Sequence, residues 1–201
     1  LKKGVGRVIS FDNYTRGRKN NLFNAFKSER FEFIKGDLRD KKLLNSVTKG
    51  VDGVFHMASQ CLAYWQEKPW DGFDVNVNGT FKLMEACANN NVKRFIFSSS
   101  SSIYGNSIYS PMDENHPFNN KNFYGASKIC DEALLKAFFY TFGIPYLNLR
   151  YMNVYGPRQD HLGTYVAVII KIIDNIENEK NPKINGDGSQ KFDFVYVDDV
   201  C

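Results

Sequence analysis

Histidine and cysteine are scarce in this chain of 201 residues, which has three of the former and four of the latter. The histidines, at positions 56, 116 and 161, are too widely spaced for a zinc-binding motif. The cysteines form no Cys-x-x-Cys pair, a distribution typical of reduced thiols in a cytosolic protein. We therefore expect no metal site and a cytoplasmic location.

Long apolar runs and concentrated charge are also missing. No apolar stretch approaches the length of a membrane span, and no signal-peptide pattern opens the chain. The net charge is only +4, and lysine and arginine do not form a stripe interleaved with aromatic residues. We expect neither a membrane nor a nucleic-acid partner. The length suffices for one sizeable hydrophobic core.

Strand-like and helix-like segments alternate, which predicts a parallel sheet with helices on both faces. The expected buried strands are residues 7–12, 31–36, 53–58, 94–98 and 146–151. The expected helices are residues 38–49, 72–89, 124–142 and 164–177. Gly143 is the expected C-cap of the third helix, and Pro145 follows it.

Both ends of the chain read as if they were cut from a longer protein. Residues 2–4 are typical of the last turn of a helix with a C-cap glycine. Gly4-Val-Gly6 is not a dinucleotide-binding motif, because no strand precedes it and Ile9 stands where the third glycine belongs. Asp12 closes a strand and fits the acidic residue that follows such a glycine loop by about 20 residues. The glycine loop is therefore expected roughly ten residues before Leu1.

A tyrosine and a lysine stand four residues apart in Tyr124-Gly-Ala-Ser-Lys128. On a helix, these positions lie on one face, so the two side chains can share a site. A phenol beside a fixed positive charge ionises more readily, and a phenolate can take a proton from a sugar hydroxyl. Taken alone, this spacing also fits a surface or packing role.

Eight short segments follow one another in a characteristic order. They are Asp12-Asn13, Gly36-Asp-Leu38, His56-Met-Ala-Ser59, Asn76-Val-Asn-Gly-Thr80, Ser98-Ser-Ser-Ser-Ser-Ile-Tyr-Gly105, Tyr124-Gly-Ala-Ser-Lys128, Leu149-Arg-Tyr-Met-Asn-Val-Tyr-Gly-Pro157 and Asp193-Phe-Val-Tyr-Val-Asp-Asp199. The set resembles the extended short-chain dehydrogenase/reductase family, specifically its nucleotide-sugar epimerases and dehydratases. The resemblance implies a Rossmann-like, doubly wound parallel sheet over residues 1–156, lacking its first strand and glycine loop. Residues 157–201 would begin a small substrate-binding domain.

The resemblance implies that the cofactor is NAD. Asp12 would hold the adenosine ribose hydroxyls and repel a 2′-phosphate, which favours NAD over NADP. Asp37 and Leu38 would line the adenine pocket. Asn76 would be a helix N-cap, a cofactor contact, or both. Three residues would run beneath the cofactor or, alternatively, form a strand end packed in the core: Met57, Ala58 and Ser59.

The resemblance also implies a catalytic set of Tyr124, Lys128 and Ser100. Ser100 is selected among five serines because it lies four residues before Tyr104 of the Tyr-Gly pair. Lys128 would bind the nicotinamide ribose and favour ionisation of Tyr124. Ser100 would align the substrate hydroxyl, and Tyr124 would remove its proton while NAD takes hydride from the same carbon.

The residues after Ser100 favour one reaction within the family. Related 4,6-dehydratases carry an Asp-Glu pair here, because elimination of water needs an acid and a base, and decarboxylating relatives keep the Glu. This chain has Ser101 and Ser102 instead. The pattern indicates a 4-epimerase acting on a UDP-hexose or its N-acetyl analogue. A dehydratase, a decarboxylase and a reductase remain alternatives, and so does a non-catalytic NAD-binding sensor.

The remaining expectations concern substrate and partner. Asn153 would contact the nucleotide sugar, and Arg158 would contact its diphosphate or be a solvated loop cation. Asp198 and Asp199 are expected to begin a helix. The helix over residues 124–142 is apolar enough to bury one side and pair in a homodimer, or to be buried within one subunit. As it stands, the fragment is expected to bind NAD poorly and to be inactive.

Overall fold

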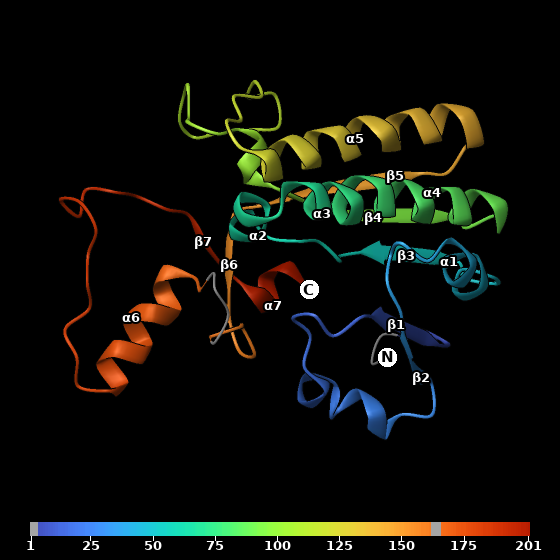
Figure 1. Cartoon of the computed structure of the whole chain (residues 1–201), viewed down its shortest axis with the longest axis horizontal. Coiled ribbons are helices and arrows are strands. Elements are labelled where there is room, and N and C mark those ends of the chain that lie inside the picture. Colours follow the sequence, from blue (N-terminus) through green and yellow to red (C-terminus); the bar gives the residue numbers. More distant parts are fainter. Residues whose placement is uncertain (1–3, 162–165) are drawn as a thin grey trace. The chain divides into compact units, whose positions relative to one another are not determined.

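The computed structural model describes residues 4–161 and 166–201 and divides into two compact units, Leu1–Arg150 and Tyr151–Cys201 (Figure 1). This division falls shortly before the predicted domain boundary after residue 156. The assignment of the two predicted domains to NAD binding and substrate binding stays a prediction. Two parts of the predicted elements lie outside the described residues. They are Lys2 and Lys3 of the expected helical turn, and Thr164 and Tyr165 of the expected helix 164–177.

The first unit opens with a pair of parallel strands, β1 (Val8–Asp12) and β2 (Phe31–Lys35). Their register pairs Val8 with Phe31 and Asp12 with Lys35, so both strands end at the same edge. Two 3₁₀ helices, Lys19–Leu22 and Ala25–Lys27, connect the strands. The sequence pattern did not predict these two short helices.

A second sheet has the order β3-β4-β5. Its strands are β3 (Gly53–His56), β4 (Arg94–Ser100) and β5 (Tyr146–Tyr151). β3 and β4 are parallel, with Gly53 opposite Arg94 and His56 opposite Phe97. All five predicted strands are therefore present, and the Rossmann-like parallel α/β class is confirmed.

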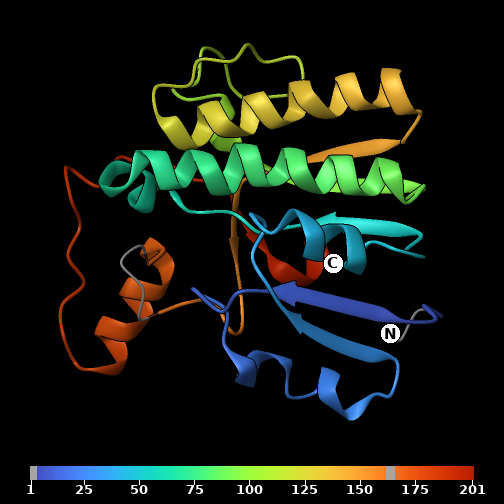
Figure 2. The same ribbon diagram turned by 45° about the vertical axis from the view of Figure 1, so that its right-hand side comes forward.

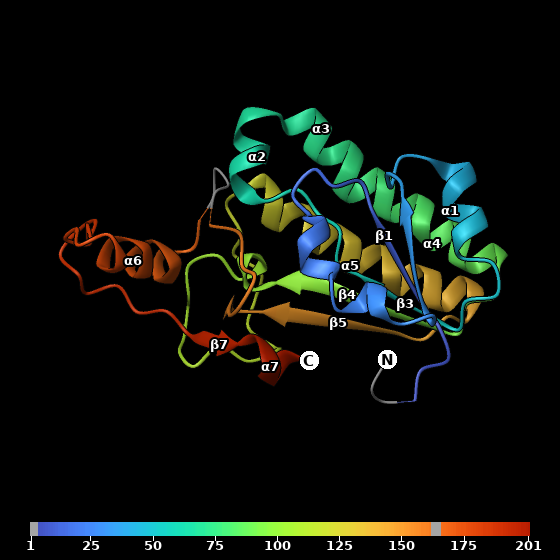
Figure 3. The ribbon, with the colours of Figure 1, turned by 90° about the horizontal axis from the view of Figure 1, so that it is seen from below.

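Three helices lie together on one face of this second sheet, as three views agree (Figures 1, 2 and 3). They are α1 (Lys41–Val47), α4 (Thr80–Asn89) and α5 (Phe123–Phe142). Between them and the strands lies an apolar core that includes Leu44, Met84, Cys87, Phe95, Phe97, Leu135 and Phe138. On the opposite face, Phe55 and Leu147 are 71% and 53% exposed. Among the described residues of this unit, no α-helix covers that face.

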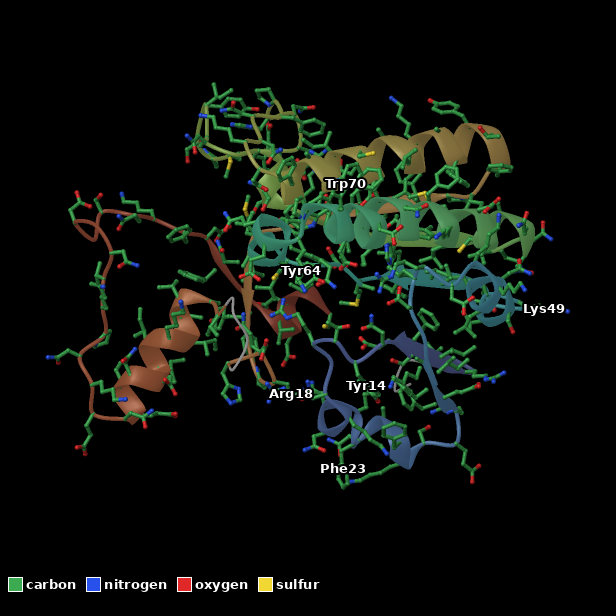
Figure 4. All side chains as sticks on the ribbon, viewed as in Figure 1. Tyr14, Arg18, Phe23, Lys49, Tyr64 and Trp70 are labelled. Carbon is green, nitrogen blue, oxygen red and sulfur yellow. The ribbon has the colours of Figure 1, made fainter. Side chains whose placement is uncertain are left out.

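A continuous helical rod precedes β4. It consists of α3 (Pro69–Phe73), a π-helical turn η3 (Asp74–Gly79) and α4. The predicted helix over residues 72–89 therefore starts earlier and changes its pitch midway. The short helix α2 (Leu62–Glu67) holds the buried Trp65, whereas Trp70 on α3 is 84% exposed (Figure 4). Both tryptophans thus lie in helices.

The second unit contains two short parallel strands, β6 (Asn153–Tyr155) and β7 (Phe194–Tyr196). Its helices are α6 (Val168–Glu177) and α7 (Val197–Val200). Asp198 and Asp199 lie in the first turn of α7, as predicted. Across the described ranges, no helix is both long enough and apolar enough to cross a bilayer.

Candidate active site

Helix α5 places Tyr124 and Lys128 one turn apart on the same face. The helix begins where the Asn122 side chain accepts a hydrogen bond from the Gly125 amide at 2.8 Å. It ends at Gly143, whose left-handed conformation (φ 71°) gives the predicted C-cap. The Lys128 Nζ lies 5.6 Å from the centroid of the Tyr124 ring. The predicted proximity of phenol and ammonium is therefore present.

Gly125 allows the first turn of α5 to approach the serine segment closely. A Cβ atom at this position would lie 2.6 Å from the Ser102 carbonyl oxygen and would also strike the Asn120 side chain. Only glycine fits without displacing this backbone. The residue after Tyr124 thus sits directly against the segment that contains Ser100.

Lys128 is buried and tied to the end of β4. The residue is 3% exposed, and its Nζ donates to the Ser98 carbonyl oxygen at 2.9 Å. Burial lowers the pKa of Lys128, because the charged ammonium group loses hydration. Burial together with the nearby Lys128 charge also lowers the pKa of His56 to about 3. His56 therefore stays neutral, with its Nε2 2.8 Å from the Thr80 hydroxyl.

The serines at the end of β4 have different environments. Ser99 is buried and donates to Glu132 Oε1 at 2.5 Å. Ser100 is half-buried; its hydroxyl donates to the Ser102 hydroxyl at 3.1 Å and accepts from the Ser102 amide at 3.2 Å. Ser100 thereby caps a short 3₁₀ turn, Ser101–Ile103.

Glu132 and Arg150 form an ion pair beneath these residues. The Arg150 guanidinium contacts both carboxylate oxygens of Glu132, with distances of 2.8 Å from Nη2 to Oε2 and 3.1 Å from Nε to Oε1. Arg150 also donates to the Tyr104 hydroxyl and the Glu114 carbonyl oxygen, each at 3.0 Å. The carboxylate raises the pKa of Arg150 above its ordinary range. The pair connects α5, β4, β5 and the loop after β4.

Asp12 lies at the carboxyl end of β1, as predicted. Its Oδ1 accepts a hydrogen bond from the Tyr14 amide at 2.6 Å, which turns the chain sharply after the strand. Gly17 packs against the same carboxylate, because a Cβ atom there would lie 2.9 Å from Oδ1. The following loop therefore holds the Asp12 side chain in place.

Asp37 is bound by protein groups on several sides. Arg39 contacts both of its carboxylate oxygens at 2.8 Å, and the Asn13 amide donates to Oδ2 at 3.0 Å. These hydrogen bonds, with Arg39 the largest influence, hold the pKa of Asp37 well below its ordinary range. Arg39 also reaches Asp71 of α3 at 2.8 Å. The Asp37 side chain thus joins the loops after β1 and β2, while Leu38 beside it is buried.

The segment after β3 is open to solvent. Met57 is 70% exposed, Ala58 is exposed and Ser59 is half-buried, so the alternative of a strand end packed in the core is wrong for the first two. Asn76 lies inside η3, so the N-cap alternative is also wrong. Its amide accepts from the Gln60 amide at 2.7 Å and donates to the Gln60 carbonyl at 3.1 Å. Asn76 therefore fixes Gln60, at the end of the segment that contains Met57, Ala58 and Ser59.

Asn153 and Arg158 belong to the second unit. Asn153 on β6 donates to the Asp193 carbonyl oxygen at 3.1 Å. Arg158 follows β6 in a loop and has a left-handed backbone with φ 69°. Their predicted roles in substrate binding stay predictions. Among the described residues, no group of three or more His, Cys, Asp or Glu side chains has metal-site geometry.

Comparison with known proteins decides the family. The model of the NAD dependent epimerase/dehydratase family matches residues 1–201. The chain belongs to this family. It is 34% identical over 204 residues to the UDP-glucose 4-epimerase of Mycolicibacterium smegmatis, covering 100% of this chain and 64% of that protein.

Solved members of the epimerase/dehydratase family have the same fold. The UDP-N-acetylglucosamine 4-epimerase of Methanobrevibacter ruminantium, in complex with UDP-N-acetylmuramic acid, superposes with a TM-score of 0.92 at 40% identity, covering 96% of this chain and 62% of that one. The Thermotoga maritima UDP-glucose 4-epimerase, with UDP-glucose, gives 0.91 at 32% identity, covering 99% and 64%. Matches also include 4,6-dehydratases and a Thermus thermophilus UDP-glucose 4-epimerase in complex with NAD. The chain spans 63% and 64% of the length of two curated family members.

Sequence reasoning missed several residues at the site of this epimerase/dehydratase family member. They are the charged residues Arg39, Asp131, Glu132 and Arg150, for which the sequence pattern predicted no role. The spacing of Glu132, four residues after Lys128 on the same helical face, was an available signal. No local signal pairs Glu132 with Arg150, because 18 residues separate them.

Proposed function

We propose that the complete protein containing this chain is an NAD-dependent nucleotide-sugar 4-epimerase. The substrates would be UDP-glucose and UDP-galactose or their N-acetyl analogues. The observation that carries this proposal is the Tyr124–Lys128 pair on a helix that contacts the backbone of Ser98 and Ser102, in a serine segment without a carboxylate after Ser100. Elimination of water would need an acid and a base near that point, whereas epimerisation needs only oxidation at C4, rotation of the 4-keto sugar and reduction from its other face.

The proposed chemistry assigns one task to each of three residues. Tyr124, as the phenolate, takes the proton from the C4 hydroxyl of the sugar and later returns it. Lys128, with its ammonium 5.6 Å from the Tyr124 ring centroid, favours the phenolate electrostatically. Ser100 hydrogen-bonds the same hydroxyl and aligns it. When bound, NAD supplies the hydride acceptor and donor for the C4 carbon.

The proposed NAD site lies at the carboxyl ends of the parallel strands, where ligands bind in open α/β sheets. Its residues are Asp12, Asp37, Leu38, Met57, Ala58, Ser59, Asn76, Tyr124 and Lys128. The exposed Met57 and Ala58 leave room for a ligand to pass close to the backbone. Because Arg39 and Asn13 occupy the Asp37 carboxylate, we infer that Asp37 acts mainly by fixing the surrounding loops.

For the substrate, we infer contacts from Asn153 and Arg158 to the nucleotide sugar and its diphosphate. A guanidinium group binds phosphate oxygens by charge-assisted hydrogen bonds, which supports Arg158 in this role. Residues 157–201 would then begin the substrate-binding domain, after an NAD-binding domain over residues 1–156.

We also propose that the protein is a homodimer that pairs through α4 and α5. Leu135 and Phe138 of α5 are buried in the core, whereas Phe139 and Tyr140 are 40% and 76% exposed. Phe81 of α4 is 42% exposed and packs edge-on against Phe138 at 5.3 Å. This apolar surface supports a helix-pairing interface. Sedimentation of the complete protein tests the mass, and Tyr140→Glu should shift it toward the monomer.

A cytoplasmic location is part of the same proposal. The four cysteines, Cys61, Cys87, Cys130 and Cys201, are free thiols. This supports a reducing compartment.

The decisive experiment is proton NMR of the products formed by the complete protein with NAD and either UDP-glucose or UDP-N-acetylglucosamine. We expect the galacto epimer without net formation of NADH. A 4-keto-6-deoxy sugar would instead identify a dehydratase, and a pentose with carbon dioxide a decarboxylase.

Tyr124→Phe provides the matched control, because it removes only the phenol oxygen. We expect this variant to lose turnover while it still binds NAD. Unchanged product formation by the variant would contradict the assigned role. Wild-type protein that binds NAD but converts no nucleotide sugar would support the sensor alternative.

A further inference from the structure

Asp131 is a buried carboxyl group that the proposed mechanism does not use. The residue is 1% exposed, and neither oxygen of its side chain has a hydrogen-bond partner in the described structure. Burying a charged carboxylate without hydrogen bonds costs free energy, unless a nearby opposite charge offsets the cost or the group takes up a proton. Lys128 lies three residues earlier on the same face of α5, and its charge acts on Asp131.

We propose that Asp131 is a positioning residue that keeps the Lys128 ammonium group charged as the pH rises, and thereby keeps Tyr124 active as a base. This inference rests on the proposed function, because it acts through two of its catalytic residues. It adds a residue that neither the spacing of the motif nor the assigned roles include.

Asp131 and Lys128 are both buried. Burial favours the neutral form of each, so it raises the pKa of Asp131 and lowers that of Lys128. The Asp131 charge opposes the effect of burial by raising the pKa of Lys128, and the Lys128 charge does so by lowering the pKa of Asp131. As the pH rises, the pair first loses one proton, and the carboxylate then helps to retain the proton that remains on Lys128. Without the carboxylate, only burial acts on the pKa of Lys128, so the ammonium group loses its proton at a lower pH.

Among the residues that the structure describes, Asp131 is the carboxylate whose charge raises the pKa of Lys128. On β3, His56 remains neutral because its pKa is lowered to about 3, chiefly by burial. On α4, burial raises the pKa of the Cys87 thiol to about 12. On α5 itself, burial and the Asp131 charge raise the pKa of Cys130, and Glu132 is held by Arg150. On β4, the Ser98 carbonyl oxygen accepts a hydrogen bond from Lys128, and this oxygen carries no net charge.

The test compares Asp131→Asn with Lys136→Gln in the complete protein with NAD bound. Both variants remove one charge from α5, but Lys136 is exposed. For Asp131→Asn, we expect the alkaline limb of the kcat profile to move down by about one pH unit, with a rate about tenfold below wild type at high pH. At pH 6 the two rates should agree within about twofold. Lys136→Gln should follow the wild-type profile.

Two outcomes would overturn the proposal: an unchanged alkaline limb in Asp131→Asn, or an equal loss of rate at every pH, which is the result of a merely structural role. Carbon-13 NMR of the wild-type side-chain carboxyl groups gives a second test that needs no variant to fold. Because the two groups interact, we expect the Asp131 carbon signal to change in two steps, the second of which occurs as Lys128 loses its proton. An Asp131 signal without this alkaline step would refute the inference. The NMR result does not depend on turnover, so it separates this failure from a failure of the 4-epimerase assignment.

Discussion

Lys128 donates a hydrogen bond from Nζ to the carbonyl oxygen of Ser98 at a distance of 2.9 Å. This contact joins the helix that contains Tyr124 to the strand that ends with Ser100. Because Lys128 is 3% exposed, solvent competes little for the bond. The position of the ammonium group thus depends on the backbone of β4 as well as on α5.

Ser100→Ala should lower kcat by about 10²-fold, because one hydrogen-bond donor to the reacting hydroxyl is lost. The Ser101→Ala variant is the matched control and should stay within about threefold of wild type. The measurement is steady-state turnover of the nucleotide sugar by the complete protein. If Ser101→Ala showed the larger loss, the choice of Ser100 among the five serines would be wrong.

Gly125→Ala should impair catalysis by pushing the first turn of α5 away from Ser102. The added Cβ would lie 2.6 Å from the Ser102 carbonyl oxygen, closer than van der Waals contact permits. We expect a loss of about tenfold or more in kcat, since small misplacements of catalytic groups are costly. Gly53→Ala is the control, because its closest contact is 3.7 Å. Equal rates for both variants would argue against a role for this close approach.

Arg150→Met should destabilise the fold by about 3 kcal/mol, because it leaves the Glu132 carboxylate buried without its partner. The double variant Arg150→Met with Glu132→Gln should cost less than Arg150→Met alone, since no charge then remains buried. Arg7→Ala, at the exposed pair with Glu32, should cost less than about 1 kcal/mol. Urea unfolding of the complete protein measures these variants and the single variant Glu132→Gln. A double variant as unstable as the sum of its parts would show that the pairing is not the cause.

Stability should fall in acid because of His56. Its folded pKa is lowered to about 3, chiefly by burial, so below about 6.5 the unfolded chain takes up a proton that the folded chain does not. The His56 contribution is therefore complete above about pH 6.5 and is lost at about 1.4 kcal/mol per unit as the pH falls toward 3. Urea unfolding at pH 7 and pH 5 should show a smaller pH effect in His56→Gln than in wild type. The exposed His161→Gln is the control, and identical slopes in all three proteins would contradict the argument.

Local patterns predict much of this fold. Tyr146–Tyr151 is found at the expected bounds, and α5 differs by one residue from the expected helix. Both elements are bounded by strong local signals, such as the Gly143 cap. The π-helical turn was not predicted, because its residues still read as one apolar helical pattern. The short helix α2 has too few residues to show a helical period.

The candidate site likewise has features that the sequence predicts and features that it does not. The proximity of Tyr124 and Lys128 follows from helical spacing alone, so the sequence suffices to predict it. The hydrogen bond from Asn13 to Asp37 and the burial of Asp131 depend on tertiary packing. A sequence read locally assigns such charged residues to solvent, because that is where most of them lie.

The π-helical turn at Asp74–Gly79 has a consequence for how this rod tolerates changes of length. A π turn holds one more residue than an α turn, which is equivalent to a single-residue insertion that the helix has absorbed. Since each residue of an α-helix turns the direction of the side chains by about 100°, the insertion sets the facing of α3 independently of that of α4. Deleting one residue within the turn would restore a regular helix and rotate Gly72, which packs against Trp65, relative to the core residues of α4. Adding one residue elsewhere in the rod would produce a second such offset and would again rotate the side chains of α3 relative to those of α4.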